Sequence, residues 1–360
     1  MRRRWEWLLI PAFAVVGVGG GFIGAAIAAP SSPQTVSSAG NVSTGSVAAC
    51  SVTPVADDVL PSVVTIGASG QAGAGTGSGE VIKADGYILT NNHVIAPAAG
   101  GGKVEVTFAT GTTVPATIVG RDILTDLAVL KVQPPKDMKV ITLGTSSSLR
   151  VGQPVVALGA PLGLSGTVTS GIVSALDRTV EVPAENDANA LLVSAVQTDA
   201  AINPGNSGGA LVNCAGDLVG IPSAGATVPS SSGESSGGSI GLGFAIPVDL
   251  AKTISDEIIA TGRVTHAFFG VQTVPIPQAA AAEAGISGGL FVAGVVAGGP
   301  SEQAGLRQGD IITKVDGQPA TSNVQLQELT LTKNPGDKVT VDYLRDGAAA
   351  STTVTLGRQP

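Results

Sequence analysis

The chemistry of this chain centres on one serine set among glycines. Ser207 stands in the run Gly205-Asn206-Ser207-Gly208-Gly209. Glycines beside a serine allow a tight turn that exposes the hydroxyl, and they let the backbone approach a substrate carbonyl. The amides of Gly205 and Ser207 can then point at an oxygen that becomes negative during attack. The motif predicts a nucleophilic serine with an oxyanion hole.

A serine hydroxyl needs a base, and this chain has only two histidines. His93 lies upstream within Tyr87–Ile95, and Asp126 lies between it and the serine, at the start of the apolar run Leu127–Val132. A part-buried carboxylate there needs a partner, which an imidazole Nδ1–H supplies. We expect Asp126 to orient His93 and His93 to deprotonate Ser207. The chain order His, Asp, Ser is that of the chymotrypsin-like arrangement and indicates a serine protease.

Other residues compete for these roles. Asp122 and Asp199 are the alternative acids, although Asp199 lies close in sequence to the serine. His266 is expected to be a surface residue in a linker. An α/β-hydrolase needs the order Ser, acid, His, which only His266 with Asp249 or Asp256 offers, and it needs strands alternating with helices. A plain glycine-rich turn is the remaining alternative, and it leaves the convergence of the three residue types unexplained.

Composition limits the class of protein. The chain has 360 residues, enough for two or three domains. Hydrophobic residues make up 43% and charged residues 13%, so the chain is not a disordered polyelectrolyte. Aromatic residues are scarce at 3%, and therefore small and β-branched residues must fill the core, as in proteins with many short strands. The net charge of −8 argues against nucleic-acid binding.

The N-terminus carries a membrane signal. Arg2–Arg4 precede the uncharged run Trp7–Ala29, whose 23 residues can cross a bilayer as one helix. A cleaved signal peptide with Ala26–Ala28 as its processing site is the competing interpretation. We favour a transmembrane anchor within residues 1–29, followed by a flexible linker over 30–54. The protein is then expected in the bacterial cell membrane with its domains on the extracytoplasmic side, or secreted if the segment is cleaved.

The two cysteines, Cys50 and Cys214, can form one bridge in an oxidising compartment or remain unpaired small hydrophobic residues. From residue 55 the pattern changes to short apolar runs broken by Gly, Pro and Asp. Such strands predict an all-β barrel or sandwich, which ends in one amphipathic helix over Val248–Gly262. Residues 267–358 form a separate unit with a helix near Val324–Leu329 and a hairpin turn at Arg345–Gly347.

These motifs together resemble the HtrA (DegP/DegS-type) family of extracytoplasmic serine proteases over roughly residues 55–358. The resemblance implies a mostly β fold: a chymotrypsin-like double β-barrel over 55–262, with the active site between the barrels, and a PDZ domain over 267–358. The most specific matching segments are Gly86–Val94, Asp126–Lys131, Thr198–Leu211 and Gly241–Pro247.

The resemblance also implies site residues. His93, Asp126 and Ser207 carry over as base, orienting acid and nucleophile. The remaining carried-over groups are the oxyanion hole of Gly205, Asn206 and Ser207, a pocket for small aliphatic side chains at Ile221, Pro222, Ser223 and Ala224, and a loop for peptide C-termini at Phe268, Phe269, Gly270 and Val271.

Three features depart from the family pattern. Glu80 follows Gly-Ser-Gly where an apolar residue is usual. The resemblance implies a homo-oligomer, because family members commonly form trimers through aromatic residues near the protease N-terminus, but Cys50–Ile66 has no aromatic residue. The loop Ser230–Ser239 is long and of low complexity.

The sequence thus predicts a membrane-anchored endopeptidase that cleaves unfolded proteins and is regulated by C-terminal peptides at its PDZ domain. A catalytically silent peptide-binding chaperone on the same fold is the alternative. No metal, cofactor or nucleic acid is expected.

Overall fold

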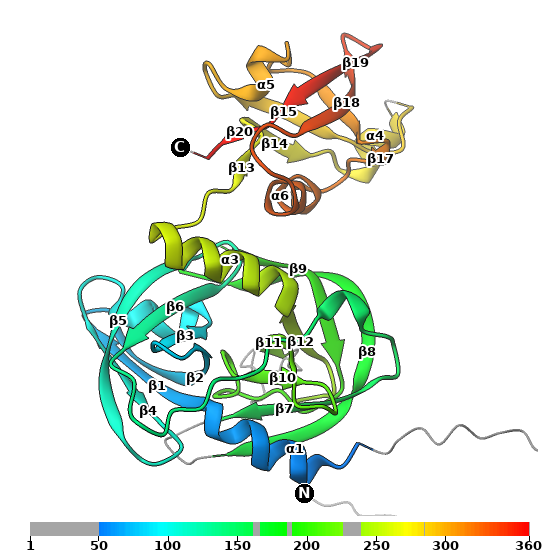
Figure 1. Ribbon diagram of the computed structural model, residues 1–360. Coiled ribbons are helices and arrows are strands. Elements are labelled where there is room, and N and C mark those ends of the chain that lie inside the picture. Colours follow the sequence, from blue (N-terminus) through cyan, green and yellow to red (C-terminus); the bar gives the residue numbers. More distant parts are fainter. Residues whose placement is uncertain (1–49, 161–165, 186–188, 226–238, 284, 360) are drawn as a thin grey trace, which may run out of the picture. The chain divides into compact units, whose positions relative to one another are not determined.

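The computed structural model describes residues 50–160, 166–185, 189–225, 239–283 and 285–359 (Figure 1). The predicted anchor at 1–29 lies outside these residues, as does nearly all of the loop Ser230–Ser239. Within the described part, none of the helices has the length and apolar character that a bilayer crossing requires.

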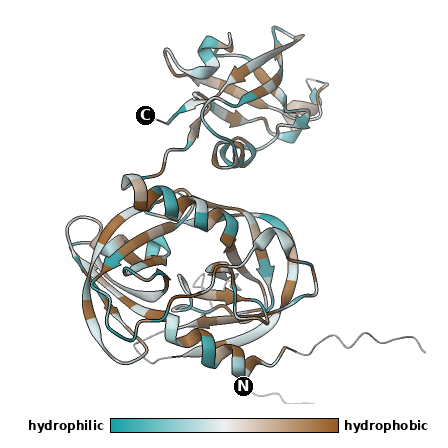
Figure 2. Cartoon of the chain, viewed as in Figure 1, coloured by the Kyte–Doolittle hydropathy of each residue, from teal (hydrophilic) through white to brown (hydrophobic). Residues whose placement is uncertain are grey.

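The first domain begins with a closed six-stranded barrel in the order β1-β2-β3-β6-β5-β4. Its strands carry brown apolar segments among paler, more polar ones (Figure 2). Exposed and buried residues alternate along β4, whereas β6 is buried at five of its six positions. The interior holds small branched side chains such as Val64, Ile66 and Ile88, as the scarcity of aromatic residues predicts. The strands are β1 (Val63–Gly70), β2 (Gly73–Lys83), β3 (Tyr87–Thr90), β4 (Lys103–Thr107), β5 (Thr113–Asp122) and β6 (Leu127–Val132), with the short helices α2 (Asn92–Ile95) and η2 (Ala96–Ala98) after β3.

A second closed barrel follows in the order β10-β11-β12-β9-β8-β7. Its own core includes Val155, Leu211 and Val219. The predicted double β-barrel is therefore confirmed. The elements are η3 (Ser146–Ser148), β7 (Pro154–Gly159), β8 (Thr167–Pro183), β9 (Asn189–Thr198), β10 (Ala210–Val212), β11 (Leu218–Gly225) and β12 (Gly243–Pro247).

Helix α3 (Val248–Thr261) covers the seam between the barrels and ends where predicted, at Gly262, whose φ is 79°. Its buried face, including Ile254 and Ile258, joins a core cluster that draws residues from both barrels, such as Leu127 and Leu158. Burial of this shared apolar layer holds the two barrels together.

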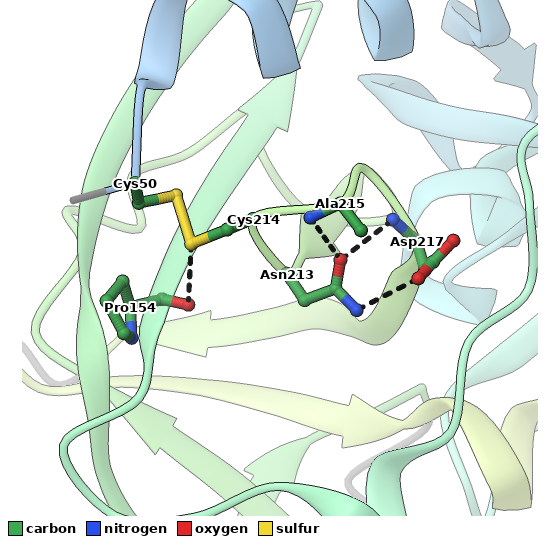
Figure 3. Close-up of a disulfide and its surroundings, with 6 residues drawn as sticks. All are labelled: Cys50, Pro154, Asn213, Cys214, Ala215 and Asp217. Carbon is green, nitrogen blue, oxygen red and sulfur yellow. Dashed lines mark hydrogen bonds between the residues drawn. A yellow bond between two sulfur atoms is a disulfide. The ribbon is translucent and has the colours of Figure 1, made fainter. Parts of the chain in front are cut away.

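The ordered domain starts earlier than the sequence indicates. Helix α1 (Val52–Val59) begins inside the predicted linker and continues into η1 (Leu60–Ser62). A disulfide joins Cys50 to Cys214, in the turn after β10 (Figure 3). Val55 and Val59 are buried against the barrels. The bridge and these contacts order a stretch whose composition alone is typical of a tether.

The C-terminal unit is built on a sheet in the order β14-β15-β16-β18-β19, with β17 paired to β16 and β13 paired to β20. The predicted hairpin turn uses Asp346 and Gly347, both with positive φ (52° and 79°). The elements are β13 (Ala267–Phe268), β14 (Val271–Pro275), α4 (Gln278–Glu283), β15 (Leu290–Val295), α5 (Pro300–Gln303), β16 (Ile311–Val315), β17 (Gln318–Pro319), α6 (Asn323–Thr332), β18 (Lys338–Arg345), β19 (Ala348–Thr355) and β20 (Gly357–Arg358).

Glu80 lies inside the first domain, fully buried. It stands on β2, and its cross-strand partners are Val63 of β1 and Leu89 of β3, which both belong to the cluster between the barrels. Neither carboxyl oxygen has a hydrogen-bond partner among the described residues. Burial raises the pKa of Glu80 well above its ordinary value of 4.5. Burial without a partner thus favours the neutral form of this side chain.

A raised pKa makes this carboxyl a source of pH-dependent stability. The folded state keeps a proton that the unfolded state releases, so its contribution is complete below pH 4.5 and is lost as pH rises toward the folded pKa. Glu80→Gln remains neutral, so its stability advantage over the natural chain is expected to grow by up to about 1.4 kcal/mol per pH unit in that range. Urea unfolding between pH 5 and about 8 measures it. Glu105→Gln, on an exposed part of β4, should show no such trend.

Candidate active site

His93 is fixed at the start of helix α2, directly after β3. Its Nδ1 lies 2.9 Å from Asp126 Oδ2 and 3.1 Å from Oδ1, and its backbone N–H donates to Oδ1 at 3.0 Å. The imidazole is 39% exposed and the carboxylate 4% exposed. A carboxylate acceptor fixes the proton on Nδ1, which leaves Nε2 free to accept a proton from the solvent side.

Asp126 occupies the hairpin turn between β5 and β6, with a φ of 57° that few residues other than Asp, Asn and Gly adopt. Its carbonyl accepts hydrogen bonds from Asn92 N–H at 3.1 Å and from the Asn91 amide at 2.8 Å. Its carboxylate also accepts the Ser223 hydroxyl at 2.5 Å. Three donors therefore compensate the buried negative charge, two from His93 and one from Ser223.

Ser207 lies in a turn before β10, and its hydroxyl donates to the Ser223 carbonyl at 3.3 Å. Ser223 is thus next to both Ser207 and Asp126. The resemblance places Ser223 in the substrate pocket, whereas the structure directs its hydroxyl at the aspartate. Of the three residues expected to form a triad, His93 and Asp126 come from the first barrel and Ser207 from the second. Ser223 lies between the aspartate and the serine, and among the described residues no hydrogen bond joins Ser207 to His93.

The amides expected to form the oxyanion hole differ in their surroundings. The Asn206 carbonyl accepts the Gly209 N–H at 2.9 Å, so the planar peptide directs the Ser207 N–H the opposite way. The Asn206 N–H instead donates to the Asn203 carbonyl at 3.0 Å. In this conformation the Asn206 amide is occupied within the turn. Gly205, with a φ of 102°, has the backbone freedom that a rearrangement of this turn would use.

Ser78 of β2 connects the serine turn to the first barrel, a role that the sequence did not reveal. Its N–H donates to the Ser207 carbonyl at 2.9 Å, and its hydroxyl donates to the Gly205 carbonyl at 2.6 Å. The same hydroxyl accepts the Ala160 N–H at 2.8 Å, and the Ser78 carbonyl accepts the Thr90 hydroxyl at 2.7 Å. In the sequence, the one feature that could have drawn attention to this serine is its place in a Gly-Ser-Gly stretch directly before Glu80.

The other expected pocket residues lie along β11. Ile221 is fully buried in the layer between the barrels, so its side chain does not face a substrate. The Pro222 carbonyl accepts the Gly208 N–H at 2.9 Å, which ties β11 to the serine turn. Ala224 pairs through its backbone with Phe244 of β12.

The competing acids have other partners. Asp199 accepts the Ile172 N–H at 2.7 Å and thereby holds β8. Asp122 lies 2.9 Å from Nε2 of His266. The expectation that His266 is a surface residue is wrong, because its side chain is 7% exposed and the pairing with Asp122 holds it inside. Asp249, of the alternative hydrolase set, instead caps the Ser147 N–H.

The C-terminal unit has a groove of about 330 Å³ between β14 and α6, and all four expected loop residues line it. The Phe269 carbonyl accepts the Ser301 N–H and hydroxyl, and the Gly270 carbonyl accepts the Val296 N–H. Planar peptides therefore direct the N–H groups of Gly270 and Val271 the opposite way. Strand β14 is a sheet edge, the kind of element to which an extended peptide adds.

Known proteins share both units. Residues 77–221 match a trypsin-like peptidase domain, and residues 267–356 match a PDZ domain. Serine protease PepD of Mycobacterium tuberculosis is 45% identical over 352 residues, which cover 96% of this chain and 72% of that protein. The periplasmic pH-dependent serine endoprotease DegQ of Escherichia coli is 37% identical over 334 residues, 85% of this chain and 70% of that protein.

Two further proteins are similar to this chain. The solved structure of the HtrA-type protease AlgW with decapeptide is similar with a TM-score of 0.67 and 34% identity, covering 86% of this chain and 99% of that chain. The Halomonas elongata protein named "Probable periplasmic serine endoprotease DegP-like" is 40% identical over 286 residues, which are 79% of this chain. The chain spans 56% of the length of that relative.

Gly208 lies next to Ser207 at a position where a side chain has no room, so a substitution there tests whether the position of Ser207 matters for activity. Its φ is 77°, and a Cβ there would lie 2.4 Å from the Ser78 carbonyl oxygen and from Thr90 Oγ1. Gly208→Ala must therefore displace Ser207 or break its link to β2, and a displacement of about 1 Å is expected to lower kcat/KM about 100-fold. Gly111→Ala is the control. Its φ is 83°, so an alanine there causes similar backbone strain, but the space around it is open and no steric clash results. This variant should keep full activity.

Proposed function

The chain belongs to the HtrA family of serine proteases, which join a trypsin-like peptidase domain to a PDZ domain, and from this premise we propose that His93, Asp126 and Ser207 are its catalytic triad. The observation that carries this assignment is the double contact of His93 with a buried Asp126, whose carboxylate also accepts the hydroxyl of Ser223, the residue whose carbonyl accepts the Ser207 hydroxyl.

Each group has a defined step in the proposed reaction. Asp126 keeps the proton of His93 on Nδ1, so that Nε2 takes the proton of Ser207 as its oxygen attacks the peptide carbonyl. The amides of Gly205 and Ser207 stabilise the oxygen that becomes negative. The imidazolium then protonates the leaving amine, and water releases the acyl group by the same route in reverse. The Asn206 amide joins the oxyanion hole only if the turn releases it from Asn203.

The substrates are proposed to be unfolded or misfolded proteins outside the cytoplasm. Periplasmic relatives support this location, and the disulfide between Cys50 and Cys214 fits an oxidising compartment. The apolar run Trp7–Ala29 is proposed to anchor the chain in the membrane. Assembly into trimers stays a prediction from the family.

The assignment of the nucleophile is tested with the full-length chain and fluorescent casein. Ser207→Ala removes the attacking oxygen and is expected to lower turnover by about a million-fold, because triad residues act as a unit. Ser148→Ala, at an exposed serine of η3, is the matched control. Turnover that survives in Ser207→Ala would contradict the triad, and an inactive natural chain would favour the silent chaperone.

We further propose that C-terminal peptides bind the groove between β14 and α6 and raise protease activity. The N–H groups of Gly270 and Val271 would receive the terminal carboxylate while the peptide pairs with β14. Near Ser207, the change proposed to accompany activation is release of the Asn206 N–H from the Asn203 carbonyl, which would add a third donor to the oxyanion hole.

A decapeptide ending in valine tests this regulation. Its free carboxylate is expected to raise the rate of casein cleavage, whereas the C-terminal amide should bind at least about tenfold more weakly, since hydrogen bonds to a charged group contribute about 1.5–3 kcal/mol. Gly270→Ala should abolish the response, because φ is 79° and a Cβ would meet Pro300 at 2.9 Å. Equal stimulation by acid and amide would exclude carboxylate recognition.

A further inference from the structure

The second histidine of the chain lies in the segment 262–266, between α3 and β13. This segment is docked on the first domain. The carbonyl of Gly262 lies so close to β5 that a Cβ on Gly120 would come within 2.3 Å of it. The Thr265 N–H donates to Glu257 Oε1 at 2.9 Å. The segment therefore has fixed contacts with the strand that leads toward the catalytic aspartate.

His266 and Asp122 form a buried pair at the end of β5. The distance from Nε2 to Oδ2 is 2.9 Å, and the side chains are 7% and 6% exposed. A carboxylate this buried destabilises the fold unless donors surround it, so the Nε2–H of His266 compensates a large part of its charge. The His266 carbonyl accepts the Gln359 N–H at 3.0 Å, which fixes the main chain as well.

Asp122 in turn organises the hairpin that carries Asp126. Its Oδ1 accepts the Leu124 N–H at 3.3 Å, and its Oδ2 accepts the hydroxyl of Thr125, which is 1% exposed. Asp122 also pairs with Leu127 and so closes the hairpin. The residue between Thr125 and Leu127 is Asp126, with its φ of 57°.

We infer that His266 is a positioning residue for peptide-bond hydrolysis. Through Asp122 it holds the turn Ile123–Asp126 in the conformation that presents the Asp126 carboxylate to His93. The inference rests on the proposed triad. His266 itself is too buried to meet a substrate, so it acts only through the turn.

The test compares three variants of the full-length chain on an internally quenched peptide with valine before the scissile bond. His266→Leu removes the donor to Asp122 and is expected to lower kcat about 10- to 100-fold with little change in KM. His266→Gln retains an amide N–H and should restore most of the rate. Leu149→Ala removes buried apolar volume from the second barrel; it should lower the melting temperature and leave kcat unchanged.

A signal independent of turnover is the low-field proton resonance of the His93 Nδ1–H bonded to Asp126, which should move in His266→Leu and not in Leu149→Ala. If His266→Leu does not fold, Asp122→Asn provides the same loss of charge-assisted pairing. Full kcat together with an unmoved resonance in His266→Leu would overturn the inference. A natural chain that neither cleaves the peptide nor reacts at Ser207 with a fluorophosphonate would contradict the proposed function instead, and the resonance would still decide the positioning.

Discussion

The geometry of the proposed active site depends on one negative charge held inside the protein. Asp126 is almost fully buried, and a carboxylate in that position is tolerated only when donors surround it. The fold supplies three donors: the backbone N–H of His93 in α2, the imidazole Nδ1–H of the same residue, and the hydroxyl of Ser223 on β11. The first two come from the first barrel and the third from the second. The need to compensate this charge therefore aligns both barrels at the point where Ser207 lies.

The serine turn is held by a second connection between the barrels, which is polar but uncharged. Ser78 binds two carbonyls of the turn, and Gly208 and Gly209 allow the first barrel and β7 to come within contact distance of it. These contacts satisfy backbone groups that the turn would otherwise bury without partners. Within this turn the Asn206 N–H donates to the Asn203 carbonyl, and a rearrangement that frees it would use the backbone freedom of Gly205, whose φ is 102°.

Local sequence patterns predicted the features that depend on neighbouring residues alone, such as the end of a helix or the position of a turn. The apolar periodicity and final glycine of α3, and the Asp-Gly turn at 346–347, were readable because each signal lies within its own element. The roles of Ser78, Ser223 and His266 were not, because their partners lie 127, 97 and 144 positions away. A serine or histidine in a linker or strand has no local signature of such a contact. Glu80 was visible as an anomaly, but only the paired strands show that it faces an apolar layer.

The two histidines make similar contacts with an aspartate and differ in how far their side chains are exposed to solvent. Each has a ring nitrogen 2.9 Å from an aspartate carboxylate. The partner of His93 is Asp126, in the β5–β6 hairpin turn, and the partner of His266 is Asp122, at the end of β5. His93 keeps 39% of its side chain exposed, so its second nitrogen can meet a substrate and a nucleophile. His266 is 7% exposed, and the hydroxyl near its aspartate, that of Thr125, is buried and already donates to Asp122. In the proposed triad, the same pair of residue types therefore transfers a proton at one end of the turn, and in our inference it fixes the turn at the other end, so that the linker carrying His266 supports the proposed catalytic acid.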